Sequence, residues 1–522
     1  MSAATAREAH PAGNRSRLPS LAARIVWIEV RHSAFVWALP LLAALFVFDP
    51  FLTASHYPAL WTLRSSVVLD KFWPVCVPFA AGFSAWAGSR EARRNVDDLL
   101  GATARPAWTR QLCSLAATLF WLLAAFLAGV AVLYVSISRA VTWGGPPLWP
   151  VAAGAVSLTA AAALAFTLGL LFPGRFTAPI VAVGISVLTL AIFSRTVSEG
   201  GTSVFALSPD GIVPGNDAGV FYPVAPDVSI VQVMFFTGCT LGAVGLLGLS
   251  PRTGGAGWRG ALDLASGGGA RLRAVATAVF AAGIALAVVG FGLAATARVS
   301  SVTGGVEVPV LHDGASDKAI PYAPICADAS GGFPVCLHPA YKSYLGQVVS
   351  SVGPIMAELS GLPGAPARAA EVFGQALPSV VPQANRDGVV TGSPPVFEFS
   401  MDGALAQVPN AAQFRDGFRQ DIVHAVIVGP VGQMTADGGF QPDTGTPAQQ
   451  AVEDGLLTAI GSQPYPLCPQ GDYSGAGQCT PQAQVTAAAA RFAALPAAPR
   501  HAWLAAHLAA LRAGRITLAL IP

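Results

Sequence analysis

The sequence is poor in charge and contains almost no lysine. Only 11% of its 522 residues are charged, whereas a soluble protein of average composition carries about 25%. Arginine outnumbers lysine 27 to 3, and the three lysines follow Asp70, Asp317 and Tyr341. The chain therefore has no Gly-Lys pair and cannot form a P-loop, in which a lysine reaches the phosphates of a nucleotide. We expect no ATP hydrolysis by this chain.

Other catalytic patterns are missing as well. The sequence contains neither an H-E-x-x-H zinc-protease motif nor a G-x-S-x-G nucleophile elbow. His501 and His507 are six residues apart, so they do not share the helix face that a metal site needs. Cys336 and His338 are close in sequence, but a disulfide at Cys336 would leave His338 as a surface or packing residue. We expect no catalytic residue, no metal site and no cofactor in this chain.

Long apolar runs without internal charge dominate the first 300 residues. Because the hydrocarbon core of a bilayer is about 30 Å thick, a helix needs about 20 apolar residues to cross it. Seven runs fit, at residues 33–52, 71–90, 110–139, 148–172, 175–195, 227–252 and 273–298. Lipid offers no partner for a backbone group, so each run is expected to be helical. The sequence predicts an α-helical polytopic membrane protein with about seven transmembrane helices.

The positions of the positive charges predict the orientation of these helices. With the N-terminus in the cytoplasm, the inside segments hold fifteen arginines, whereas the three short outside loops hold Arg64, Lys71, Arg139 and Arg195. Positive charge collects on the cytoplasmic side of membrane proteins. Seven crossings then place residues 299–522 outside the cell. The richness in arginine, alanine, glycine and proline is typical of a GC-rich bacterial genome, so we expect a bacterial plasma membrane.

The chain divides into three parts. We assign residues 1–32 to a cytoplasmic tail and connecting helix, residues 33–298 to the transmembrane domain and residues 299–522 to an extracytoplasmic domain. Residues 1–298 hold 20 basic and 12 acidic residues, whereas residues 299–522 hold 10 and 16. Halves of opposite net charge usually face different surroundings. The lipid bilayer is an expected partner, and nucleic acid is not.

The segment before the first span has the pattern of an amphipathic helix. In residues 20–35, Leu21, Ile25 and Ile28 recur at helical spacing while arginines lie on the other side. Trp27 suits the headgroup layer of a membrane. The segment is predicted to lie along the inner leaflet. The alternative is a simple N-terminal extension of the first span.

Four of the seven cysteines fall in the predicted extracytoplasmic domain. They form two close couples, Cys326 with Cys336 and Cys468 with Cys479. Disulfides persist in oxidising compartments, and pairing within each couple is the simplest of three connectivities. A zinc site is the alternative, although the intervals are longer than the C-x2–4-C of structural zinc sites. We predict two disulfides.

The densest charge near the spans lies in SREARRNVDDLLGATARPAWTRQ, residues 89–111. The predicted topology places this stretch in the cytoplasm between the second and third spans. Two arginines each stand four residues before an acid, a spacing that favours pairing on a helix surface (Arg93 with Asp97, Arg94 with Asp98). A proline then ends the helix. We predict a short charged helix, a turn and a return into the membrane.

This loop resembles the first cytoplasmic loop of the ABC-2-type permeases of ATP-binding cassette (ABC) transporters, which reads like R-E-x-x-x-G-T-x-E-x-L-L-x-T-P-x-x-R. The opening, the acidic-Leu-Leu core and the closing threonine match, whereas Asn95-Val96 replaces Gly-Thr and Ala104 replaces proline. The resemblance covers about residues 20–250. The candidate coupling residues are Arg90, Glu91, Arg94, Asp97, Asp98, Leu99, Leu100 and Thr103.

The resemblance implies the permease subunit of an exporter. In that family the loop forms a coupling helix that docks onto a separate ATPase subunit, which would hold ATP and Mg²⁺. Family permeases act as dimers, so a second copy of this chain or a related permease is an expected partner. An amphipathic connecting helix before the first span is another family feature. The alternative for the loop is a segment whose arginines only fix the topology.

The predicted extracytoplasmic domain carries mixed signals. Residues 299–313 and 418–430 are rich in valine and isoleucine and are predicted to be strands. Helical spacing is found in residues 341–359, 448–460, 482–495 and 501–512. We predict a C-terminal α+β domain. The alternative function for the whole chain is a membrane-anchored extracytoplasmic sensor or binding protein without transport activity.

Overall fold

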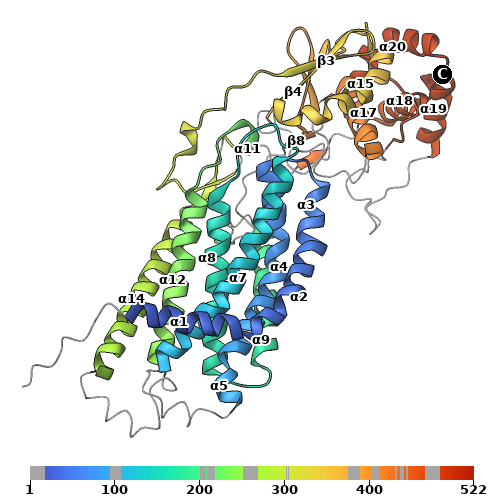
Figure 1. Ribbon diagram of the computed structural model, residues 1–522. Helices are drawn as coiled ribbons and strands as arrows, with labels where there is room; N and C mark the ends of the chain where they lie inside the picture. The colour runs from blue at the N-terminus through green and yellow to red at the C-terminus, as the bar shows by residue number, and fades with distance from the viewer. Residues whose placement is uncertain are drawn as a thin grey trace, which may run out of the picture.

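The computed structural model describes residues 18–94, 107–199, 207–208, 218–250, 268–300, 302–303, 305–373, 388–401, 411–429, 432–434, 440–442, 445–464 and 483–522. Figure 1 shows a bundle of long helices and, beyond one end of it, a C-terminal domain built from residues after 298. The short helix α5 (Arg90–Arg93) lies at the opposite end of the bundle. We call these two ends of the bundle the domain end and the hairpin end.

The bundle is built from apolar helices at nearly all the predicted positions. Among the described residues, six are long and apolar enough to span a membrane. The first of the six is a run of short helical segments, η2 (Ala34–Ala38), α2 (Leu39–Phe46), η3 (Val47–Phe51) and α3 (Leu52–His56). The other five are α4 (Trp61–Gly88), α7 (Ala107–Ser138), α8 (Leu148–Leu171), α12 (Asp227–Leu249) and α14 (Gly268–Ala294). The remaining predicted span coincides with α9 (Thr177–Glu199), whose described apolar stretch is Thr177–Leu188.

The second helix starts earlier than the sequence predicts. The sequence predicts that the second span starts at Lys71 and that Arg64 and Lys71 belong to a loop. Both residues lie inside α4. The guanidinium of Arg64 donates to the backbone oxygens of Tyr57 and Pro58 at 2.9–3.2 Å, and Lys71 pairs with Asp70 at 3.4 Å. Because these charges have partners at the helix surface, they do not interrupt α4, which is 28 residues long.

The N-terminal segment forms a helix of its own. Helix α1 (Leu18–His32) lies across the long helices near the hairpin end (Figure 1). It ends before Ser33, whose backbone is extended and whose hydroxyl accepts a hydrogen bond from the Phe35 N–H at 3.2 Å. The alternative, in which this segment extends the first span, is therefore wrong. The predicted separate helix is confirmed.

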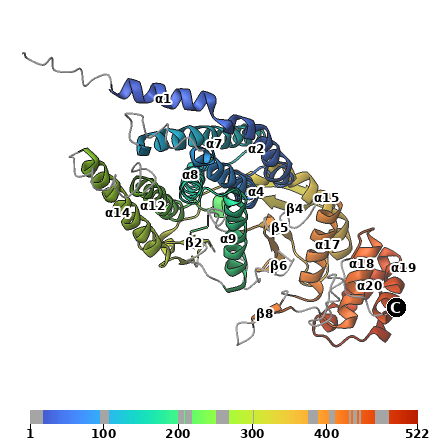
Figure 2. The same ribbon diagram turned by 90° about the horizontal axis from the view of Figure 1, so that it is seen from below.

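Close backbone contacts join neighbouring helices of the bundle. A Cβ added at Gly88 of α4 would lie 2.1 Å from the Phe166 oxygen of α8, and one at Gly169 would lie 2.0 Å from the Ala85 oxygen. Helices α12 and α14 meet in the same way, because a Cβ at Gly283 would lie 2.3 Å from the Gly242 nitrogen. Small residues let membrane helices approach until their backbones touch. Figure 2 shows α12 and α14 side by side at the edge of the bundle opposite the C-terminal domain.

A mixed five-stranded sheet forms one half of the C-terminal domain. The strand order is β3-β4-β5-β7-β6, with parallel pairing of β4, β5 and β7 and antiparallel edges. The strands are β3 (Ile325–Ala329), β4 (Phe333–Leu337), β5 (Arg368–Glu371), β6 (Gly388–Thr391) and β7 (Val396–Phe399). Two smaller hairpins pair β1 (Arg298–Val299) with β2 (Val306–Glu307) and β8 (Gly432–Met434) with β9 (Phe440–Pro442). The predicted α+β composition of this region is confirmed.

Helices form the other half of the domain. They are α15 (Leu345–Leu359), preceded by the 3-10 segment η7 (Pro339–Tyr344), then α17 (Ala411–Ile427), α18 (Pro447–Ala459), α19 (Ala483–Ala494) and α20 (Ala497–Arg512). All four predicted helices are confirmed. Arg500 of α20 donates twice to the carboxylate of Glu358 of α15, at 2.6 and 3.0 Å. This bidentate contact fixes the last helix against the first.

One predicted strand is wrong. Residues 418–427 belong to α17 rather than to a strand. Phe414, Phe418, Ile422 and Val426 are four residues apart and all buried, which is the pattern of a helix face. The predicted window began inside the helix, so the spacing from Phe414 was missed. In the other predicted strand region, residues 299–313, the described residues form the short β2 and the second residue of β1.

The first predicted disulfide is confirmed. Cys326 of β3 and Cys336 of β4 face each other across the antiparallel hairpin and are bonded. The Cys336 thiol is therefore unavailable as a nucleophile. The second couple, Cys468 and Cys479, lies outside the described residues.

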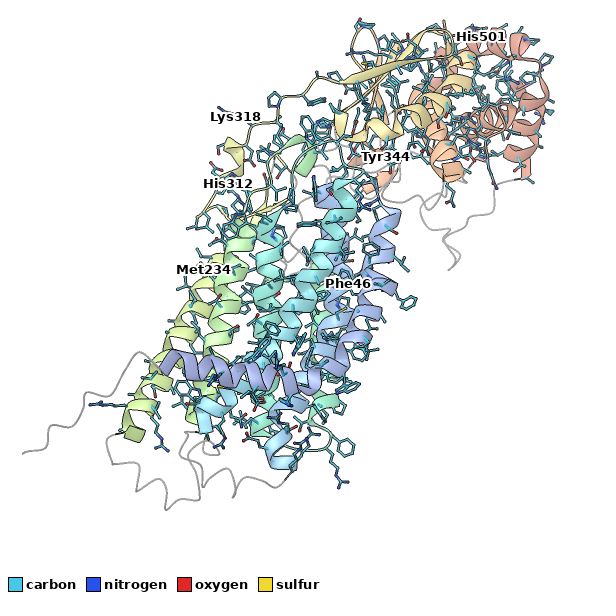
Figure 3. The ribbon with its side chains drawn as sticks, in the orientation of Figure 1. Phe46, Met234, His312, Lys318, Tyr344 and His501 are labelled. Carbon is cyan, nitrogen blue, oxygen red and sulfur yellow. A yellow bond between two sulfur atoms is a disulfide. The ribbon has the colours of Figure 1, made fainter. Side chains whose placement is uncertain are left out.

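The core of the C-terminal domain continues into the bundle. Leu60 and Leu63, at the start of α4, are 3% and 2% exposed and belong to the same apolar cluster as the domain's Leu337 and Tyr341. Phe221 of the one-turn helix α11 (Ala218–Phe221) is part of that cluster. Figure 3 shows Tyr344 directly above the helices at this point. We call the contact made by Leu60, Leu63, Trp143, Phe221 and His338 the domain joint.

Candidate functional site

The predicted coupling loop lies at the hairpin end of the bundle. Helix α4 ends at Gly88, and α5 follows directly from Arg90 to Arg93. Helix α7 begins at Ala107, while residues 95–106 lie outside the described part of the chain. The loop is thus a hairpin between α4 and α7, as the sequence predicts. It is separated from the C-terminal domain by the length of the helices (Figure 1).

Arg90 anchors the hairpin to α1. Its guanidinium lies 3.4 Å from the carboxylate of Glu29. Both side chains are about one-third exposed, so the pair is worth less than about 1 kcal/mol. A second contact holds α1 in place, because the indole N–H of Trp121 in α7 donates to the Val30 oxygen at 2.9 Å. Helix α1 is therefore fastened to both arms of the hairpin.

Glu91 closes the base of the hairpin. Its carboxylate accepts a hydrogen bond from the Gln111 amide at 2.7 Å and lies 3.7 Å from Arg110. Gln111 is 4% exposed, so Glu91 satisfies a polar group that would otherwise be buried without a partner. This contact connects the two arms at the point where they enter the bundle. Glu91 holds the hairpin together and is not presented to a partner.

Arg93 folds back on α4. Its guanidinium donates to the Trp86 oxygen at 2.7 Å and lies over the Trp86 ring, 4.7 Å from the centroid. The next residue, Arg94, is exposed. The described first half of the hairpin thus consists mostly of anchoring residues.

The structure describes only some of the predicted coupling residues. It places Arg90, Glu91 and Arg94 together at the hairpin end, but Asp97, Asp98, Leu99, Leu100 and Thr103 lie outside the described residues. The partners Glu29, Trp86 and Gln111 were not predicted. Glu29 had one available signal, because it is the only acidic residue in α1. Trp86 and Gln111 lie in or beside apolar runs, where nothing in the sequence marks them.

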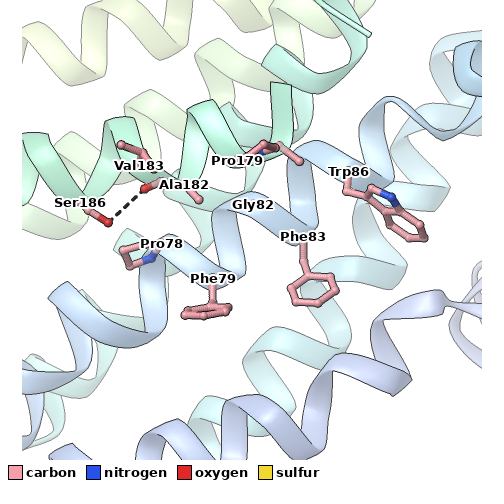
Figure 4. Close-up of a pocket in the computed structure, with 10 residues that line it drawn as sticks. Pro78, Phe79, Gly82, Phe83, Trp86, Pro179, Ala182, Val183 and Ser186 are labelled. Carbon is pink, nitrogen blue, oxygen red and sulfur yellow. Dashed lines mark hydrogen bonds between the residues drawn. The ribbon is translucent and has the colours of Figure 1, made fainter. Parts of the chain in front are cut away.

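A shallow apolar groove runs between α4 and α9. Its volume is about 390 Å³. Figure 4 shows its lining, in which the Ser186 hydroxyl donates to the Ala182 oxygen at 3.1 Å and so offers no free donor to the groove. None of the lining residues is charged. They are Pro78, Phe79, Gly82, Phe83 and Trp86 of α4 and Ala178, Pro179, Ala182, Val183 and Ser186 of α9.

No group of three or more His, Cys, Asp and Glu side chains in the described part of the chain is arranged to hold a metal ion. His338 is fully buried, so of the two predicted roles the packing role is correct and the surface role is wrong. The His501 Nδ1–H donates to the Glu358 oxygen of α15, and the His507 Nδ1–H donates to the Trp503 oxygen one turn earlier in α20, both at 2.9 Å. Comparisons with protein-family models, with curated proteins and with solved structures gave no match.

Proposed function

We propose that this chain is the permease subunit of an ABC-2-type exporter. A separate ATPase subunit, holding ATP and Mg²⁺, docks on the hairpin of residues 89–111 and drives the helices. The permease acts as a dimer with a second copy or a related chain. The C-terminal domain lies on the outer side of the bacterial plasma membrane.

The observation that carries the proposal is the arrangement at the hairpin end. A charged hairpin projects between α4 and α7, and a separate helix, α1, lies across the bundle beside it (Figure 1). The two are joined by the pair of Arg90 and Glu29. A permease that receives force from a motor needs such a rigid handle at the cytoplasmic end. The C-terminal domain, at the opposite end, leaves this handle accessible.

The test is recovery of the intact protein from membranes under mild conditions. We expect an ATP-binding subunit to come with it. The double substitution Asp97→Lys and Asp98→Lys should abolish this association, because it reverses the charge on the part of the hairpin beyond the anchoring residues. Glu91 is unsuitable for this test, because its substitution would break the contact with Gln111.

A matched control is Asp328→Lys. Asp328 is an exposed acid in β3, at the far end of the molecule. Reversing the charge of this single acid should leave the ATPase subunit bound. Failure to recover an ATPase subunit with the unmodified, folded protein would favour the sensor or binding protein instead.

The proposed orientation has its own test. A cysteine introduced at Ala102 should resist an impermeant thiol reagent on whole cells and react after the membrane is opened. Of the cysteines that the structure describes outside the disulfide, Cys76 and Cys113 are buried and Cys239 is half-buried. The unmodified chain, treated in the same way, gives the background from all native cysteines. Labelling of Ala102→Cys on intact cells would reverse the topology and remove the basis for the exporter.

A further inference from the structure

One helix reaches from the coupling hairpin to the C-terminal domain. Helix α4 has 28 residues, and at about 1.5 Å per residue it is about 42 Å long. Its last residue is followed at once by α5 of the hairpin, and its first turn lies in the apolar core of the domain through Leu60 and Leu63.

Aromatic packing joins the domain to α11 and to the loop between α7 and α8, next to the domain end of α4. Phe221 lies 4.9 Å from the His338 ring, 5.6 Å from Phe373 and 5.7 Å from Tyr322. Trp143, in the loop between α7 and α8, meets His338 edge-on at 4.6 Å. Each aromatic pair adds about 0.5–1.5 kcal/mol beyond its buried area. The joint is therefore a tight contact.

Hydrogen bonds tie the domain to the same place. The Thr142 hydroxyl donates to the Pro339 oxygen at 2.9 Å, and the Ile320 N–H donates to the Phe221 oxygen at 2.7 Å. The Trp143 indole donates to the Val220 oxygen at 3.2 Å. These bonds connect the domain, the loop after α7 and α11 into one unit at the domain end of α4.

The covalent connection enters the domain from a different helix. The chain leaves α14 at the far edge of the bundle, crosses its end and enters the domain above α3 and α4 (Figures 1 and 2). Figure 3 marks His312 and Lys318 on this crossing segment. The domain thus packs against the start of α4, whereas its backbone connects it to α14. The domain can therefore follow the movement of either α4 or α14.

Helix α4 contains a place where it can bend. Pro74 and Pro78 lie near its middle, and each lacks the N–H that a helix residue donates to the preceding turn. Bends in helices concentrate at such positions. At the hairpin end, α4 touches α8 backbone to backbone at Gly88. A shift of the hairpin is therefore passed to α4 and α8 together.

We propose that α4 carries the C-terminal domain, so that displacement of the hairpin end moves the domain relative to α14. In the exporter proposed above, on which this role in the transport cycle rests, the domain changes position each time the ATPase changes its nucleotide state. The domain is then a moving part of the transporter and not a tethered accessory.

The first experiment needs no ATPase. Spin labels are placed on exposed residues of the full chain, at Ser350 in the domain, Thr296 beyond α14 and Ser55 in α3, which packs on α4. The free cysteines are replaced by alanine, and labelled chain is diluted with an excess of unlabelled chain. Pulsed electron resonance then measures the distances from Ser350 to Thr296 and from Ser350 to Ser55.

Gly88→Ala moves the hairpin end of α4. The new Cβ would start 2.1 Å from the Phe166 oxygen and needs at least 3.0 Å, so the helices must separate by about 1 Å. We expect the distance from Ser350 to Thr296 to shift and the distance from Ser350 to Ser55 to stay constant. Gly169→Ala opens the same contact from the α8 side and replaces Gly88→Ala if that variant does not fold. Gly184→Ala in α9, with nothing within 4 Å of its Cβ, is the control.

Two results would overturn the proposal. One is an unchanged distance from Ser350 to Thr296 in both Gly88→Ala and Gly169→Ala. The other is an equal change in both measured distances, since the domain would then move independently of α4.

The second experiment adds the nucleotide to the complex recovered from membranes. ATP with vanadate should shift the distance from Ser350 to Thr296 and leave the distance from Ser350 to Ser55 unchanged. If no ATPase subunit is recovered, the proposed function fails while the glycine experiment still tests α4. If an ATPase is bound and both distances are insensitive to nucleotide, the role of α4 in the cycle fails and the exporter stands.

Discussion

The two ends of α4 are held by different kinds of contact. At the domain end, Leu60 and Leu63 are almost completely buried in an apolar core that includes Phe221, which packs on the His338 ring. At the hairpin end, α5 contacts α1 through a polar and partly exposed pair, Arg90 with Glu29 at 3.4 Å. Apolar burial stabilises by about 25 cal/mol per Å², whereas an exposed ion pair contributes less than about 1 kcal/mol.

The difference suits the two proposed roles. A contact that must stay closed through a cycle needs a large, cooperative apolar surface. A contact that must respond to a partner should be held by interactions of small free energy, which interactions with the partner can replace. The backbone contact at Gly88, the last residue of α4, joins the hairpin end of α4 to α8. Each prediction below weakens one end and leaves the other intact.

The largest effect is expected at the domain joint. Phe221 is 4% exposed and touches three aromatic rings. Phe221→Ala should destabilise the joint by about 3–5 kcal/mol, because it removes a buried aromatic side chain and leaves a cavity. Limited proteolysis of the full chain should then cut the segment between α14 and the domain much faster.

Phe176→Ala is the matched control. Phe176 loses the same atoms but is 73% exposed. Its substitution should leave the proteolysis rate unchanged. Equal rates for the two variants would show that the domain is not held by this joint.

A smaller effect is expected when His338 is protonated. The ring is completely buried, and its Nδ1 accepts a hydrogen bond from the Ala340 N–H at 3.1 Å, so the neutral ring carries its proton on Nε2. Burial lowers the pKa of His338 to about 4, from 6.5. The neighbouring charged group is Glu371, whose carboxylate accepts the His338 backbone N–H at 2.6 Å.

The direction of the pH effect follows from this shift. Between pH 6.5 and 4 the undocked or unfolded chain binds a proton that the folded chain does not, so stability falls as the pH falls through that range. Above pH 6.5 the contribution is constant, and the loss by pH 4 is on the order of 3 kcal/mol. Thermal unfolding of the full chain should show it. His338→Gln should flatten the response in this window, and a variant that titrates like the unmodified protein would refute the assignment.

Much of the bundle was predictable because its signals are local. A run of about 20 uncharged apolar residues must be helical in lipid, so α7, α8 and α12 match their predicted bounds within three residues. The start of α4 was not predictable, because Arg64 is satisfied by backbone oxygens that only the fold brings to it. For α17 the reason is different. The helical spacing begins at Phe414, but the predicted strand was assigned from residues 418–430 alone, so the spacing was not recognised.

The candidate site was predictable in place but not in mechanism. The charge pattern located the hairpin, and α5 begins where the motif begins. The pairing of Arg90 with Glu29 joins residues 61 positions apart, and that of Glu91 with Gln111 joins residues 20 apart. The domain joint is a still longer-range feature, because Trp143 and His338 are brought together only by the docking of two separately encoded regions. No periodicity or motif in the sequence predicts such contacts between distant residues.

The smallest effect is expected at the hairpin end. Glu29→Gln removes the charge that pairs with Arg90, and the loss should be less than about 1 kcal/mol because the pair is partly exposed. Hydrogen exchange of the α1 amides should accelerate by no more than about fivefold, with no change in the domain. Arg24→Gln, an exposed change on the same helix, should have no effect. If Glu29→Gln instead loosened the domain as much as Phe221→Ala does, the hairpin end would be as tightly built as the joint, and the contrast between a fixed end and a responsive end of α4 would be lost.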